Sequence, residues 1–118
     1  MKSSHFCIAL ILISAVVFSI VVSSDADAKA TDVKKIPGGK KFSCALCHSE
    51  DNYKGGLSSF ENDFKTNGMI WNAALAKKDS DGDGKLNGQE LNDPDGKWKQ
   101  GDADPSGPIT NPGDAASK

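Results

Sequence analysis

The clearest hydrophobic periodicity lies near the middle of the chain. Phe60 and Phe64 are spaced i, i+4, which places both rings on one face of a helix. Ser58 stands before them as an N-cap residue, and Glu61 follows three residues later, as in a capping box. The pattern therefore predicts a short helix over residues 59–66.

The next stretch predicts a second helix over residues 70–78, with Trp71 and Leu75 on one face. An acidic segment follows, and any helix after it is about one turn long because Pro94 cannot continue a helix. Residues 95–118 are rich in Gly, Pro and Asp and predict extended irregular structure. Because no pair of strands stands out, we expect a small single domain, mainly α, with extensive irregular structure.

A different pattern occupies the start of the chain. Residues 6–22 form an unbroken run of apolar and small side chains, followed by small-residue patterns that end at Ala28 and Ala30. This layout is typical of a secretory signal peptide cleaved after one of those alanines, the alternative being an uncleaved anchor. The predicted organisation is a signal peptide over 1–30 and a domain over 31–118, with a flexible arm over 31–41 and a frayed tail over 114–118. We expect a periplasmic or extracellular protein with no membrane span after cleavage.

The charge of the chain limits the partners it can bind, and its few large apolar residues limit how it can be stabilised. The chain has 14 basic residues, all of them Lys, against 16 acidic ones, for a net charge of −2. Without Arg or a basic patch, nucleic acid is not an expected partner. The large apolar side chains outside the first segment are few, and domains this small usually need a disulfide, a metal or a cofactor to be stable.

A candidate metal site spans residues 79–90, "DSDGDGKLNGQE", which follows the EF-hand calcium loop position by position. Gly84 falls at position 6, where the loop turns sharply with positive φ. Closely spaced carboxylates repel one another unless a cation lies among them. The ligands that the template predicts are Asp79, Asp81, Asp83, the Lys85 backbone carbonyl, Asn87 and Glu90.

The flanks of the loop differ from those of a full EF-hand. Pro94 truncates the exiting helix, and no second loop is present to pair with the first. We therefore expect one structural calcium ion rather than a sensor that opens a groove. A weaker alternative is a second, irregular site, which would use Asp93, Asp95, Asp102 and Asp104.

The motif Cys44-Ala45-Leu46-Cys47-His48 matches the attachment pattern of a c-type haem. In that reading Cys44 and Cys47 bind one covalent haem and His48 is the proximal iron ligand. A zinc knuckle is disfavoured because a structural zinc site needs four ligands and the motif offers three. A thioredoxin-like dithiol is disfavoured because the sequence shows no βαβ unit. A plain disulfide between the two cysteines is the serious rival in an oxidising compartment.

Met69 is the candidate for the sixth iron ligand. It lies between the two predicted helices, and a thioether ligand would raise the reduction potential relative to a second imidazole. Ordinary core packing is the alternative role for this side chain. A site closed by Met69 would suit electron transfer, whereas an open site would allow small-ligand chemistry.

A broader resemblance covers residues 60–102, about half of the predicted mature chain. This segment resembles the temptin-type domain of secreted proteins. The matching positions are Phe60, Asp63, Phe64, Gly68, Trp71, Asp79 to Gly84, Asn87, Gly88, Glu90, Leu91, Asp93, Pro94, Trp98 and Gly101. The resemblance implies a secreted, calcium-stabilised module, and animal members are associated with signalling or attraction. This chain lacks their additional cysteines and carries Met69 where many relatives are expected to have His.

Two functional hypotheses follow. The leading one is an exported monohaem c-type cytochrome, with short helices around the haem and a structural calcium ion, that transfers single electrons to partners with basic docking surfaces. The alternative is a haem-free, secreted, temptin-like calcium-binding module for recognition or adhesion, with a Cys44–Cys47 disulfide. In neither case do we expect an enzyme.

Overall fold

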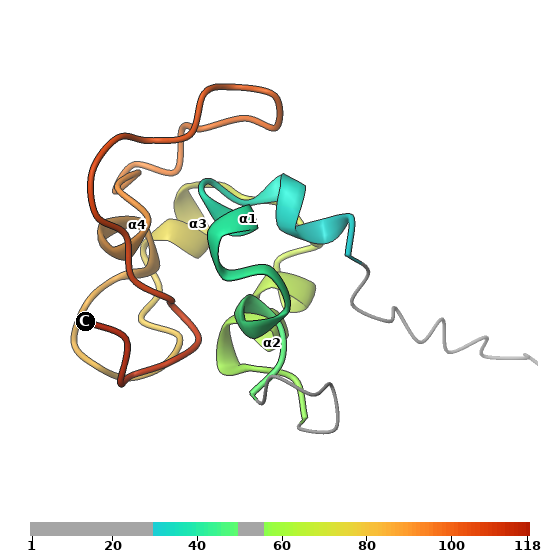
Figure 1. Cartoon of the computed structure of the whole chain (residues 1–118), viewed down its shortest axis with the longest axis vertical. Helices are drawn as coiled ribbons and strands as arrows, with labels where there is room; N and C mark the ends of the chain where they lie inside the picture. Colours follow the sequence, from blue (N-terminus) through green and yellow to red (C-terminus); the bar gives the residue numbers. More distant parts are fainter. Residues whose placement is uncertain (1–29, 50–55) are drawn as a thin grey trace, which may run out of the picture.

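The described residues form short helices connected by turns and by longer irregular segments (Figure 1). The computed structural model describes residues 30–49 and 56–118, so the predicted signal peptide, apart from Ala30, lies outside the described residues. The elements in chain order are the 3-10 helix η1 (Asp32–Lys35), α1 (Gly39–Phe42), the 3-10 helix η2 (Ser43–Leu46), α2 (Ser59–Thr66), α3 (Ala73–Ala76) and α4 (Asn87–Glu90). In the described part of the chain, β pairing is limited to an isolated bridge between His48 and Leu57.

The helix predicted over residues 59–66 is present as α2, with the predicted boundaries. Ser58 caps it, since its Oγ accepts a hydrogen bond from the Glu61 N–H at 3.0 Å. Phe60 and Phe64 are buried and stacked, with ring centroids 6.2 Å apart. The reciprocal half of the capping box is absent, because the Ser58 N–H donates to the Cys47 carbonyl at 2.8 Å instead.

The second predicted helix is shorter than expected. Residues 70–78 contain only α3, a single turn that begins after Asn72. The Asn72 Oδ1 accepts a hydrogen bond from the Leu75 N–H at 3.1 Å and so caps the helix two residues after Ile70. Ile70 lies before the helix with 58% of its surface exposed. The apolar spacing therefore predicted correctly that Trp71 and Leu75 are buried, but it placed the start of the helix too early.

Residues 31–41, where the sequence predicts a flexible arm, are folded and packed in the structure. This segment forms η1 and α1 and contributes Ile36, which is 1% exposed, to the core. The Gly38 N–H donates to Asp104 Oδ1 at 2.9 Å, which joins the segment to the far end of the chain. Burial of an isoleucine side chain contributes roughly 2 kcal/mol, so this segment is an integral part of the domain.

The core lies where α2, α3, α4 and the N-terminal helices meet. Its fully or nearly buried apolar side chains are Ile36, Leu46, Cys47, Phe60, Phe64, Trp71, Leu75, Ala76 and Leu91. Gly88 allows α4 to approach closely, because a Cβ there would lie 2.6 Å from the Asp93 carbonyl oxygen and 3.0 Å from the Ala76 Cβ. Trp71 is fixed by a 2.7 Å hydrogen bond from its Nε1 to Asp93 Oδ2.

The C-terminal segment is irregular, as predicted, and forms long loops outside α4, drawn in orange and red in Figure 1. The frayed tail predicted over 114–118 is not observed. Ser117 folds back, and its Oγ accepts a hydrogen bond from the Asn111 N–H at 2.9 Å. Among the described residues, no helix has the length and apolar character needed to cross a membrane.

Candidate functional site

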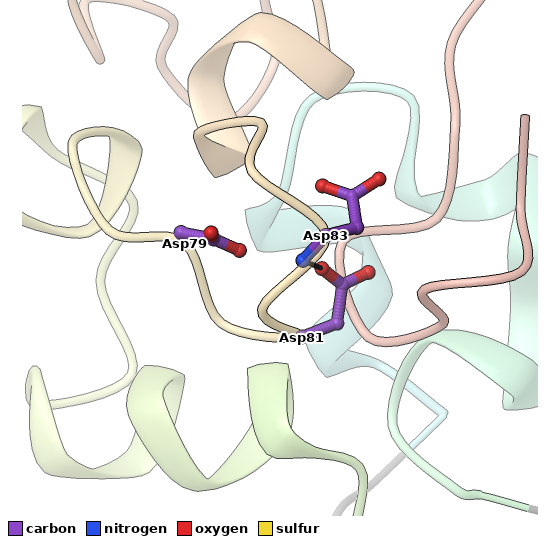
Figure 2. Close-up of side chains that lie close together, drawn as sticks. All are labelled: Asp79, Asp81 and Asp83. Atoms are coloured by element: carbon purple, nitrogen blue, oxygen red, sulfur yellow. Dashed lines mark hydrogen bonds between the residues drawn. The ribbon is translucent and has the colours of Figure 1, made fainter.

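The acidic loop between α3 and α4 brings three predicted ligands together. Asp79, Asp81 and Asp83 each offer a carboxylate oxygen, and these oxygens lie within 4.8 Å of one another (Figure 2). The loop is shaped by its own backbone: the Gly82 N–H donates to Asp79 Oδ1 at 2.8 Å and the Gly84 N–H to Asp79 Oδ2 at 3.0 Å. Gly84 has the positive φ expected at loop position 6, at 92°.

Glu90 presents a fourth carboxylate to this loop from α4. It is 3% exposed, and its Oε1 accepts a hydrogen bond from the Thr110 Oγ1 at 2.9 Å. Within the described chain, its Oε2 has no hydrogen-bond partner, nor does the buried Asp81 Oδ2. The pKa of Glu90 is raised to about 7, chiefly by burial and also by the negative charges of Asp81 and Asp83, against the lowering effect of the Thr110 hydrogen bond. Neighbouring carboxylates that repel one another, with a buried oxygen on Glu90 and another on Asp81 left without a hydrogen bond, fit a cation well.

The other two predicted calcium ligands are Asn87 and the Lys85 carbonyl, and the Asn87 side chain is already bonded to other groups. The Asn87 side chain is fully buried and donates to the Leu75 carbonyl and the Ser80 Oγ, both at 2.9 Å. Its Oδ1 accepts from the Ser80 N–H at 3.2 Å. Asn87 thus ties the loop to α3, and ligation through it stays a prediction, as does ligation by the Lys85 carbonyl.

The second acidic group predicted in the C-terminal segment is not assembled into one site. Each of its four carboxylates organises a different turn or contact. Asp93 binds Trp71 and the backbone of Trp98, and Asp95 pairs with Lys97 at 2.7 Å. Asp102 accepts from the Lys99 N–H, and Asp104 accepts from Gly38. Among the described residues, only the three aspartates of the loop converge as closely as a metal requires.

The two cysteines of the C-x-x-C-H motif occupy different environments. Cys44 lies half-buried in η2, and Cys47, at its C-terminal end, is 4% exposed in the core. The Cys47 and His48 N–H groups both donate to the Cys44 carbonyl, at 3.2 and 3.0 Å, so the motif forms one tight turn. Both cysteines are thiols in this structure.

Sequence reasoning did not identify Glu61 as part of this site. Its side chain is fully buried, and burial raises its pKa, although the neighbouring Cys47 thiol lowers it. The sequence did contain a signal, because Leu57, Phe60, Glu61 and Phe64 follow the i, i+3, i+4, i+7 spacing of one helix face. A carboxylate within an apolar stripe is exceptional and indicates a special role.

Met69 does not lie opposite His48. His48 bridges to Leu57 just before α2 begins, whereas the Met69 N–H donates at 2.8 Å to the Phe64 carbonyl near the end of α2. An eight-residue helix is about 12 Å long, so the two side chains start from opposite ends of α2. Met69 instead lines a surface hollow of about 540 Å³ with Lys35, Gly68, Ile70, Trp71, Trp98, Lys99 and Gln100.

Covalent haem attachment stays a prediction that gains no support from the described residues. The hollow beside Met69 is lined by none of the three motif residues, and Cys47 packs in the core cluster. The pairing of His48 with Met69 as axial ligands gains no support from this geometry.

Comparison with known proteins agrees with the broader resemblance. The family model described as Temptin C-terminal matches residues 26–114. Temptin from Aplysia californica is 50% identical over 48 residues, which cover 41% of this chain and 38% of that relative. The chain thus matches well under half the length of this relative, and no solved structure matches it. The expectation that the chain is not an enzyme agrees with the temptin match. Because the family match spans well over half of the sequence, the chain belongs to the temptin C-terminal family.

Proposed function

We propose that this chain is an exported, haem-free recognition or adhesion module of the temptin type, stabilised by one structural calcium ion. The calcium assignment rests on the buried Glu90 carboxylate. Its Oε2 lacks a hydrogen bond in the described chain, and the negative charges of Asp81 and Asp83 act on it. Without a cation this arrangement is repulsive, and with one it is neutralised.

The residues that would hold the ion come from both ends of one loop. Asp79, Asp81 and Asp83 belong to the loop itself, and Glu90 belongs to α4. The Lys85 carbonyl completes the set that we propose, with Asn87 acting only through a water, since its amide is engaged with Leu75 and Ser80. A bound calcium ion would supply positive charge and fix the loop to α4.

The structural role follows from what the loop connects. Its first half is tied to α2, because the Ser80 Oγ donates to Asp63 Oδ2 at 2.8 Å and Lys78 forms an ion pair with Asp63 at 2.7 Å. Its end carries Glu90, which holds Thr110 of the C-terminal segment. An ion bound between these parts would clip α2, α4 and the irregular segment together.

Export and the recognition role rest on observations separate from those for calcium. Export is supported by the signal-peptide pattern of residues 1–30, and the family match begins at residue 26, beyond the apolar run. The recognition or adhesion role is supported by the temptin match. Recovery of processed chain from the culture medium would support export, whereas retention of the full-length chain in the membrane fraction would contradict it.

Calcium dependence of unfolding is the decisive measurement for the ion. The calcium-loaded protein should melt at a higher temperature than the protein in chelator, and magnesium should have a smaller effect because the loop offers many flexible oxygen ligands. Asp95→Asn is a matched control, since Asp95 is exposed, pairs with Lys97 and is not one of the proposed ligands. A melting temperature unaffected by chelator would reject the structural ion.

A further inference from the structure

The buried carboxylate of Glu61 has no role in the calcium module and needs an explanation. It is 0% exposed, and among the described residues neither of its oxygens accepts a hydrogen bond of normal geometry. Burial of a carboxylate without partners is costly, so such groups are rare unless the site uses them. Its helix does not need it, because Ser58 already caps α2 and binds only the Glu61 backbone.

The Cys47 thiol is the polar neighbour of this carboxylate. Cys47 is itself 4% exposed, and burial together with the adjacent Glu61 raises the pKa of the thiol far above its usual range. Cys47 therefore keeps its proton until a base removes it. Burial also raises the pKa of Glu61, which makes this carboxylate a stronger base than an exposed one.

Cys44 completes the arrangement from the more exposed side. Its side chain is only partly buried, and the Ser43 hydroxyl lies 3.5 Å from its sulfur. The hydrogen bond from the Cys47 N–H to the Cys44 carbonyl places the two residues one turn apart. Residues three apart on a helical turn have Cβ atoms about 5–6 Å apart, so a small backbone shift is enough to reach the roughly 4 Å that a disulfide needs.

We propose that Cys44 and Cys47 form a redox-active dithiol–disulfide pair in which Glu61 is the proton acceptor for Cys47. The substrate class is an accessible disulfide of a protein or small molecule when the pair is reduced, and an accessible dithiol when it is oxidised. The proposal is independent of calcium and deepens the Cys44–Cys47 disulfide of the proposed module, which would otherwise be only structural.

The exchange proceeds in two balanced steps. The Cys44 thiol loses its proton to solvent and attacks one sulfur of the substrate disulfide, so that a mixed disulfide forms and the first substrate thiolate leaves. Glu61 then takes the proton of Cys47, whose sulfur attacks the Cys44 sulfur. The Cys44–Cys47 disulfide forms as the second substrate thiolate leaves. That thiolate then receives a proton from Glu61 or from solvent. The pair loses two electrons and the substrate disulfide gains them.

This arrangement needs no thioredoxin fold. A redox role was disfavoured in the sequence because no βαβ unit is present. The described residues likewise contain no sheet beyond one isolated bridge. The asymmetry that such chemistry needs is nevertheless present, with a more exposed attacking thiol, a buried resolving thiol and a buried base. These features depend on side-chain burial rather than on a particular sheet.

The two steps can be separated with an aromatic disulfide that releases one coloured thiolate in each step. The reduced chain, on a Cys7→Ser background so that only the motif thiols react, should release two equivalents in two phases. Glu61→Gln should leave the first phase unchanged and slow the second about a hundredfold, because general-base catalysis typically contributes that much. Cys47→Ser should stop after one equivalent and retain the mixed disulfide, which intact mass would show.

Two further variants keep the proposal falsifiable if Glu61→Gln alters folding. Glu61→Asp retains a carboxylate, so it should restore part of the second-phase rate whatever its effect on stability. Cys44→Ser should lose the fast first phase, since Cys47 is buried. A second phase in Glu61→Gln as fast as in the parent chain, or a Cys44→Ser chain that reacts at the parent rate, would overturn the proposal.

Discussion

Glu90→Gln should stabilise the calcium-free protein and destabilise the calcium-bound one. The substitution keeps the shape of the side chain and the oxygen that accepts from Thr110, but it removes the buried negative charge. In the calcium-free protein that charge is unfavourable because it is buried and faces Asp81 and Asp83. In the calcium-bound protein the same charge is the proposed bidentate ligand, so its loss should weaken ion binding.

The magnitude follows from the pKa of Glu90, which rises from 4.5 to about 7 on folding. Between these values the folded protein binds more protons than the unfolded chain, so stability falls as the pH rises. The contribution is fully present below pH 4.5 and is lost as the pH passes through about 7. The difference of about 2.5 pKa units corresponds to roughly 3 kcal/mol, the most that Glu90→Gln can restore at pH 8.

Urea unfolding followed by tryptophan fluorescence measures both effects, because Trp71 and Trp98 lie in or against the core. In chelator at pH 8 the variant should be more stable than the parent by up to about 3 kcal/mol, and at pH 4 the two should agree. With calcium at a hundred times its Kd, the parent should gain about 2.7 kcal/mol and the variant much less. Asp95→Asn should change neither value by more than about 0.5 kcal/mol.

Two results would refute this reasoning. If Glu90→Gln in chelator is no more stable than the parent at pH 8, the carboxylate is not strained in the calcium-free protein. If calcium stabilises the variant as much as the parent, Glu90 is not a ligand.

Three further predictions concern the cofactor and the core. Chain produced together with haem-maturation machinery should show no α-band in a reduced-minus-oxidised spectrum and no covalent haem in its intact mass; an α-band with added haem mass would restore the cytochrome hypothesis. Trp71→Phe should lower the free energy of unfolding by roughly 1.5–3 kcal/mol, measured in urea, because it removes the hydrogen bond to the Asp93 carboxylate; an unchanged midpoint would show that this bond adds nothing. Gly88→Ala should cost roughly 1–3 kcal/mol, seen as a lower melting temperature, because the added Cβ collides with the backbone at Asp93; a stability equal to the parent's would mean that α4 can shift freely.

Local signals in the sequence predicted the local structure well. Helix α2 was predicted correctly because its signals, the Ser58 cap and the spacing of Phe60 and Phe64, lie within the helix or next to it. The clustering of Asp79, Asp81 and Asp83 followed from a similar local signal, since the turn itself spaces them, whereas calcium binding by them stays a prediction. The start of α3 was missed because Asn72 was read as a helix residue, whereas its side chain caps the helix.

Features that depend on distant contacts could not be predicted in the same way. The N-terminal segment looked like a flexible arm because its anchor, Asp104, lies 66 residues further along the chain. The C-x-x-C-H motif suggested haem because the sequence does not reveal that Cys47 faces the core beside Glu61. Met69 was predicted to face His48 because it is the only methionine after the predicted signal peptide, although the two residues start from opposite ends of α2.

The hydrogen bonds that join the two ends of the domain have a consequence for how it folds. Gly38 binds Asp104, and the Asn111 side chain donates to the Ala45 carbonyl at 2.9 Å, each contact spanning 66 residues. Closing such long loops costs entropy before any of the core gain is realised. A chain emerging from the ribosome therefore cannot complete this fold until Asn111 has appeared, so the contacts between the two ends of the domain form only late in synthesis.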